Sequence, residues 1–137
     1  HFMIDHHLEK YMSYHLGGWT EKQGEVLATN LLENESPLPT AILVGSDPMA
    51  IGVYRALKQK NIQIGEEIVV ASFDNIETIA NLSPGLTSVQ INAKSIGQAA
   101  VRMALERIDG IRDEPIILTY PARLIVRESF IPRTKRY

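Results

Sequence analysis

The sequence has no cysteine, no long hydrophobic run and little net charge. The absence of cysteine excludes a disulfide scaffold and a thiolate metal site, and it suits a cytoplasmic location. No stretch approaches the roughly 18 consecutive apolar residues of a membrane span, and the N-terminus lacks the layout of an export signal, so we expect no membrane partner. The net charge is -2, and the only basic run is Arg133, Lys135 and Arg136, so no surface for direct DNA binding is expected.

What is present is enough apolar material for one globular domain. The chain has 137 residues, of which 45% are hydrophobic. Apolar spacing and breaker residues predict helices over 3–14, 20–34, 46–60 and 93–109, and strands over 40–45, 67–73 and 86–91. Two short strands, interrupted by Pro121, are expected at a sheet edge within 116–126. This alternation is typical of an α/β fold, a parallel sheet flanked by helices.

The strand pattern also predicts where a ligand would bind. Residues 40–45 form a continuous apolar run, which favours a central parallel strand covered by helices on both faces. Ligands of such sheets bind at the carboxyl ends of the strands. Ser46 and Asp47 follow the first strand and Asp74 ends the second, so these polar side chains are candidate ligand contacts. Asp47 directly precedes a helix, and a helix cap is the simpler interpretation of this residue.

Four segments resemble a known family. They are PTAILVGSDPMAIG at 39–52, VVASFDN at 69–75, PGLTSV at 84–89 and LIVRES at 124–129. In this order and at these spacings they resemble the lactose-repressor and galactose-repressor family of bacterial transcription regulators.

The resemblance implies a type I, periplasmic-binding-protein-like domain of two lobes that hold an effector between them. Residues of about 1–91 and 113–137 would form the C-terminal lobe, and the helix of about 92–112 would pack on a first lobe outside this chain. The function implied is effector sensing and dimerisation in a regulator, in most cases a repressor of sugar metabolism. Operator DNA would be bound only through a separate headpiece. The effector would be a sugar or sugar phosphate, although a purine base is also open.

Carried over by position, the resemblance assigns the effector contacts to Asp74, Ser46, Trp19 and Ile91. A carboxylate at a strand end can accept two hydroxyl hydrogen bonds from a sugar, and Asp74 is the strongest candidate. Trp19 could form an aromatic wall of the site or simply pack under its loop. Ser46 stands where the family usually has asparagine, and Ile91 is apolar where polar or aromatic groups are common, so the identity of the sugar does not carry over.

A homodimer face is expected on the helix after the first strand. Ile51 falls off the predicted buried stripe of that helix, and the family dimerises through this helix and the loop near residue 82. We therefore expect Ile51, Tyr54, Arg55 and Leu82 to contribute to the interface. The alternative is that they are isolated surface residues.

Catalysis, cofactors and metal binding find little support. The sequence has no cysteine nucleophile, no G-x-S-x-G elbow and no phosphate-binding glycine loop, and its histidines lack ligand spacing. Two rival functions share the fold: a periplasmic sugar receptor that feeds a transporter, and a sugar-processing enzyme with Asp47 and Asp74 as an acid–base pair.

Overall fold

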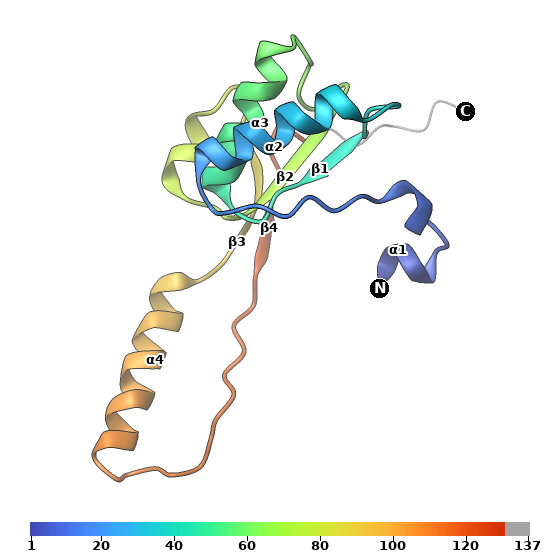
Figure 1. The fold of residues 1–137 in the computed structure, drawn as a ribbon. Helices are drawn as coiled ribbons and strands as arrows, with labels where there is room; N and C mark the ends of the chain where they lie inside the picture. The colour runs from blue at the N-terminus through green and yellow to red at the C-terminus, as the bar shows by residue number, and fades with distance from the viewer. Residues whose placement is uncertain (131–137) are drawn as a thin grey trace.

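A computed structural model describes residues 1–130 of the chain, and the basic run at 133–136 lies outside them (Figure 1). The elements follow in the order α1 (Phe2–Asp5), η1 (Glu9–Tyr11), α2 (Glu21–Asn34), β1 (Ala41–Leu43), α3 (Asp47–Gln59), β2 (Val69–Asp74), η2 (Glu77–Asn81), β3 (Thr87–Gln90), α4 (Ala93–Ile108) and β4 (Arg123–Ile125). The predicted helices over 20–34, 46–60 and 93–109 are confirmed to within a few residues.

The sheet has the strand order β1-β2-β3-β4. The first three strands are parallel and β4 is antiparallel to β3, which confirms the α/β class. The expectation that the first strand is central is wrong, because β1 lies at an edge of the described sheet. The side chain of Leu43 is 74% exposed, so this strand is also not covered on both faces. An apolar run indicates a parallel sheet but not the position of the strand within it.

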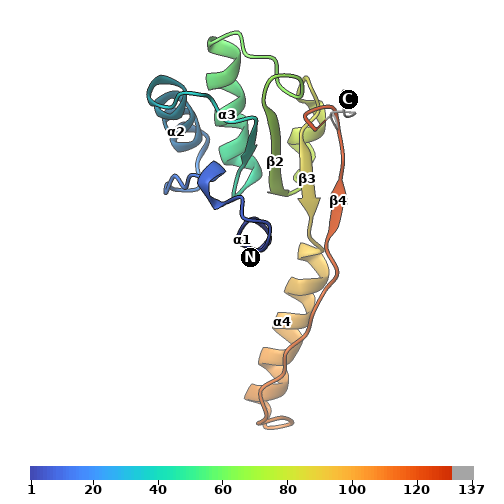
Figure 2. The same ribbon diagram turned by 90° about the vertical axis from the view of Figure 1, so that its right-hand side faces the viewer.

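One face of the sheet is covered by two layers of helix. α3 lies against the sheet and α2 packs on α3, as Figure 2 shows. The helices approach closely because glycines face backbone: a Cβ on Gly24 would lie 2.1 Å from the carbonyl oxygen of Met49. α2 begins with a capping box, in which the Thr20 hydroxyl accepts the N–H of Gln23 and the Gln23 side chain accepts the N–H of Thr20. The core beneath α3 includes Val53, Ala56, Leu57, Ile68, Val70, Ile79 and Leu86.

The predicted helix over 3–14 does not form. Only α1 and the short η1 are present, and His7 between them has a φ of 55°, outside the helical region. The apolar side chains of this segment are not packed into a core: Ile4 is 53% exposed and Tyr11 71%. An amphipathic helix of this length is stable only when its apolar face is packed, so the periodicity alone was insufficient.

α4 projects away from the sheet (Figures 1 and 2). Ala99 is its one buried residue, whereas Val101 is 62% exposed, Leu105 53% and Ile108 79%. The chain then returns to β4, which is an edge strand as expected. A second strand within 116–126 was also expected, and this prediction is wrong, because the residues of that segment before β4 have no regular structure.

Candidate functional site

A buried carboxylate ties together the ends of three elements. Asp47, the first residue of α3, is fully buried. Its Oδ1 accepts hydrogen bonds from the Oγ of Ser72 on β2 and, at 2.8 Å, from the Oγ of Ser88 on β3. Its Oδ2 accepts the backbone N–H of Ile76 at 2.7 Å. Three donors and the positive end of α3 compensate the loss of water around this carboxylate.

Asp47 is therefore not the helix cap that the sequence favoured. The N-cap of α3 is Ser46, and no side-chain capping bond is made there. The signal that could have identified Asp47 was the pair of serines, Ser72 on β2 and Ser88 on β3, which are register partners and both fully buried. Two inward hydroxyls need a shared polar partner, because buried polar groups are almost always hydrogen-bonded.

The turn that follows β2 is held in an unusual backbone conformation. Asp74 has a φ of 103° and Asn75 a φ of 54°, values that side-chain-bearing residues rarely adopt. The N–H of Asn75 donates to the Oγ of Ser88 at 3.1 Å, and its side-chain oxygen accepts from Arg127 at 2.8 Å. Arg127, which sequence reasoning missed as a site residue, also donates to the carbonyl of Leu86 at 2.5 Å. The half-buried Asp74 thus sits in a turn that is bonded on both sides.

The other predicted effector contacts lie at the same edge of the sheet. Asp74 ends β2, and Ser46 and Ile91 follow β1 and β3; the carboxyl ends of the three strands lie at one edge because the strands are parallel. Ser46 is 5% exposed, and its Oγ has no hydrogen-bond partner among the described residues. Trp19 is 72% exposed and lies beside the loop after β1, since a Cβ on Gly45 would be 3.7 Å from its Cζ3 atom. The fold thus brings Ser46, Asp74 and Ile91 to one edge of the sheet, with Trp19 beside the loop that carries Ser46.

The four residues expected at a dimer face occupy different environments. Tyr54 is 1% exposed and belongs to the core, so its assignment to a surface is wrong. Burial raises the pKa of its phenol to about 12. Ile51 and Leu82 are half-buried and pack against the core, while Arg55 is exposed and pairs with Glu21 of α2. α3 is covered by both the sheet and α2, so its buried surface is wider than a single stripe.

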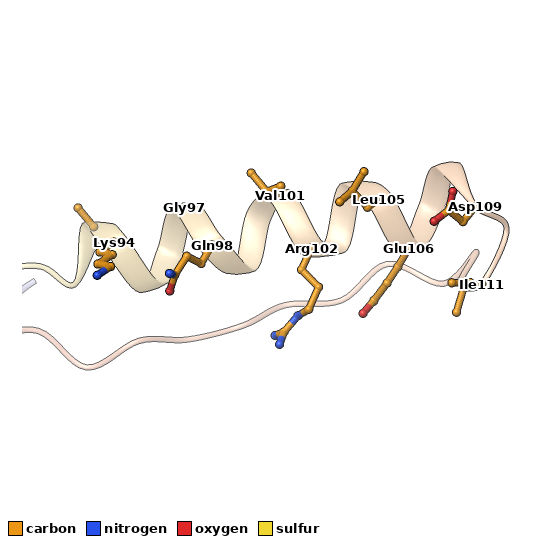
Figure 3. Close-up of a pocket in the computed structure, with 10 residues that line it drawn as sticks. Lys94, Gly97, Gln98, Val101, Arg102, Leu105, Glu106, Asp109 and Ile111 are labelled. Carbon is orange, nitrogen blue, oxygen red and sulfur yellow. The ribbon is translucent and has the colours of Figure 1, made fainter.

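A hollow lies away from the strand ends. It follows α4, has a volume of about 630 Å³ and includes Ile111 on the returning chain. Figure 3 shows Arg102 and Glu106 directed toward that chain, whereas Val101 and Leu105 point away from it. Within residues 1–130 no group of three or more histidine, aspartate or glutamate side chains is placed to hold a metal ion. No described helix combines the length and apolarity needed to cross a membrane.

Comparison with known proteins places the chain and its fold in one family. Residues 5–130 match the family described as periplasmic binding protein-like domain. A lactose operon repressor from Rhizobium radiobacter is 37% identical over 91 residues, which are 66% of this chain and 80% of that relative. The transcriptional repressor PurR of Glaesserella parasuis serovar 5 (strain SH0165) is 32% identical over 115 residues, 80% of this chain and 34% of that protein.

Solved structures with a similar fold come from the same family as these sequence relatives. The transcriptional regulator CelR in complex with cellobiose superimposes with a TM-score of 0.80 at 28% identity, over 89% of this chain and 38% of that one. The Lac repressor bound to ONPG gives a TM-score of 0.74 at 30% identity, over 82% of this chain and 34% of that one. The chain belongs to the lactose-repressor family, within the periplasmic-binding-protein-like domains, which confirms the resemblance. It spans about a third of the length of most of its curated relatives.

Proposed function

We propose that this chain is the effector-sensing and dimerisation part of a transcription repressor that responds to a small molecule, a sugar or sugar phosphate. The observation that carries the proposal is the gathering of Ser46, Asp74, Ile91 and Trp19 at the carboxyl edge of a family-typical sheet. Relatives named as repressors and structures solved with cellobiose and with ribose support this class of effector.

Asp74 is the main effector ligand in this proposal. Its carboxylate accepts hydroxyl hydrogen bonds, and Trp19 supplies an apolar wall for a sugar ring. The Oγ of Ser46 is unpartnered but buried, so in this proposal it meets the effector only when the loop after β1 shifts. In this proposal the three groups form one wall of a cleft, and the hollow along α4 is separate from it. The second wall would be the first lobe of the longer protein.

The exposed helix α4 supports the proposed division of the chain. Residues of about 1–91 and 113–137 form the C-terminal lobe, and about 92–112 pack on the first lobe. An apolar helix face with Val101, Leu105 and Ile108 largely exposed is expected where a partner surface normally covers it.

The proposed dimer lies on the exposed side of α3 and η2. Ile51, Arg55 and Leu82 remain candidates there, while the buried Tyr54 does not. Effector binding can then shift the equilibrium between open and closed lobes only by as much as the effector prefers one of the two arrangements. In this proposal the dimer transmits that shift to a headpiece on operator DNA. The protein acts in the cytoplasm without a cofactor and is not an enzyme. Relatives named as repressors do not favour the transport-receptor alternative.

The test is Asp74→Asn in the longer protein, with Asp5→Asn as the matched control. Asp5 is exposed and lies in α1. Titration calorimetry with cellobiose and ribose should give at least about a tenfold weaker affinity for Asp74→Asn, since a charge-assisted hydrogen bond to a sugar is lost. Effector-driven release of operator DNA should shift in parallel, and Asp5→Asn should match the wild type. Equal affinity in all three proteins would contradict the proposed ligand role.

A further inference from the structure

The local sequence does not favour the backbone conformation of the turn after β2. Asp74 and Asn75 are consecutive residues with positive φ, and neither is glycine. Such conformations persist only where the surrounding structure imposes them. Arg127 holds the side chain of Asn75. The contacts that hold the backbone N–H groups of Asn75 and Ile76 can be traced to one further side chain, Asp47.

Asp47 reaches the turn by two routes. Directly, its Oδ2 accepts the N–H of Ile76, the residue that follows the turn, at 2.7 Å. Indirectly, its Oδ1 accepts the hydroxyl hydrogen of Ser88, which leaves the lone pairs of that Oγ to accept the N–H of Asn75 at 3.1 Å. Only an acceptor on both sides can satisfy this set of donors, so a carboxylate fits where an amide would not.

Asp47 cannot itself touch an effector, because it is fully buried. Its bond to Ser72 additionally holds it against β2, two residues before Asp74. The carboxylate is therefore fixed relative to the strand, and the turn is fixed relative to the carboxylate.

We propose that Asp47 is a positioning residue of the effector site: through Ile76 and Ser88 it fixes the Asp74–Asn75 turn and so sets where the Asp74 carboxylate meets the ligand. This inference rests on the proposed function, because it takes Asp74 as an effector contact. It differs from that function in predicting that a residue out of reach of the effector controls affinity only by way of Asp74.

A double-mutant cycle in the longer protein tests this dependence. The variants are Asp47→Asn, Asp74→Asn and the double variant, with cellobiose and ribose as probes in calorimetry. Asp47→Asn keeps the size of the side chain but turns an acceptor into a donor that faces Ile76. We expect a loss of affinity of about five- to tenfold in the wild-type background and less than about twofold in the Asp74→Asn background.

Ser129→Ala is the matched structural control. Ser129 is also fully buried and makes two hydrogen bonds, from Thr87 N–H and to the carbonyl of Val70, but neither reaches the turn. It should lower stability without changing affinity. If Asp47→Asn lowers affinity equally in both backgrounds, or not at all, the positioning role is overturned. Should Asp47→Asn fail to fold, Ser88→Ala cuts the indirect route alone and carries the same expectation.

Amide hydrogen exchange separates failure of this inference from failure of the proposed function, because it needs no effector. Asp47→Asn should exchange the amides of Asn75 and Ile76 at least about tenfold faster, while Ser129→Ala leaves them unchanged. Unchanged exchange in Asp47→Asn overturns the inference even if the sugars bind. Faster exchange in a protein that binds neither sugar supports the hold on the turn and counts against the proposed effectors.

Discussion

Replacing Gly52 by alanine should destabilise the fold, although alanine is the better helix former. Gly52 lies in α3 where that helix crosses α2. A Cβ at this position would stand 1.9 Å from the carbonyl oxygen of Glu21 and 2.6 Å from the backbone nitrogen of Glu25. Both atoms belong to the backbone of α2, so no side-chain rotation relieves the clash, and the two helices must separate by more than an ångström.

The size of the effect follows from two opposing terms. Replacing glycine by alanine within a helix stabilises it by about 1 kcal/mol. Overpacking in a close-packed interior costs about 1–3 kcal/mol, and a clash with backbone on a neighbouring helix belongs at the upper end. The net expectation for Gly52→Ala is a loss of about 2 kcal/mol in the free energy of unfolding.

Gly97→Ala in α4 is the control, because it makes the same chemical change where a Cβ would meet nothing within 4 Å. This variant should gain about 0.5–1 kcal/mol from helix propensity alone. Urea denaturation followed by circular dichroism measures both variants, with an unchanged m-value as the check that the comparison is valid. A Gly52→Ala protein as stable as Gly97→Ala would refute the reasoning about the α2–α3 contact.

Three further outcomes are expected. Thr20→Ala removes the hydroxyl of the α2 capping box and should lower the free energy of unfolding by about 1 kcal/mol in urea denaturation; no change would mean that the cap is redundant. Tyr54→Phe should keep its free energy of unfolding at alkaline pH, where the wild type loses stability. Burial raises the pKa of Tyr54 to about 12 from the usual 10.0. The stability that the neutral Tyr54 phenol contributes is therefore fully present below pH 10, and up to about 2–3 kcal/mol of it is lost as the pH rises through 12. Wild type and Tyr54→Phe should therefore diverge in unfolding free energy between pH 9 and 12, and parallel profiles would contradict the burial argument. Leu105→Lys should change the free energy of unfolding of this chain by no more than about 0.5 kcal/mol, because Leu105 is 53% exposed. In the longer protein the same substitution should lower the free energy of unfolding by about 2 kcal/mol or more if the first lobe covers α4. Equal effects in the two proteins would contradict that packing.

Local signals in the sequence were enough to locate most elements. The Thr20–Gln23 capping box marks the start of α2, and the start of α3 after Ser46 is also visible, because caps and turns depend on residues a few positions apart. The ends of the first two parallel strands could likewise be aligned, so Ser46 and Asp74 were correctly expected at one edge.

The errors arose where the outcome depends on partners distant in sequence. The helix expected over 3–14 has the right periodicity but no surface to pack on. Tyr54 looked like a surface residue because a helix wheel shows one buried stripe, whereas α3 is covered on two sides. Asp47 looked like a cap because its partners Ser72 and Ser88 are 25 and 41 positions away.

These long-range contacts hold the turn at the carboxyl edge of the sheet from two sides. The Asp74–Asn75 turn is bonded from the α3 side by Asp47 and from the returning chain by Arg127, which binds the side chain of Asn75. In the proposed function, α3 carries the dimer face and the returning chain comes from the helix that packs on the first lobe. An effector bound by Asp74 would therefore contact a turn that is hydrogen-bonded both to α3 and to the chain that returns from α4. A switch needs differential contacts in its two states, so in the proposed function this turn, bonded from both sides, would couple lobe closure to dimer geometry.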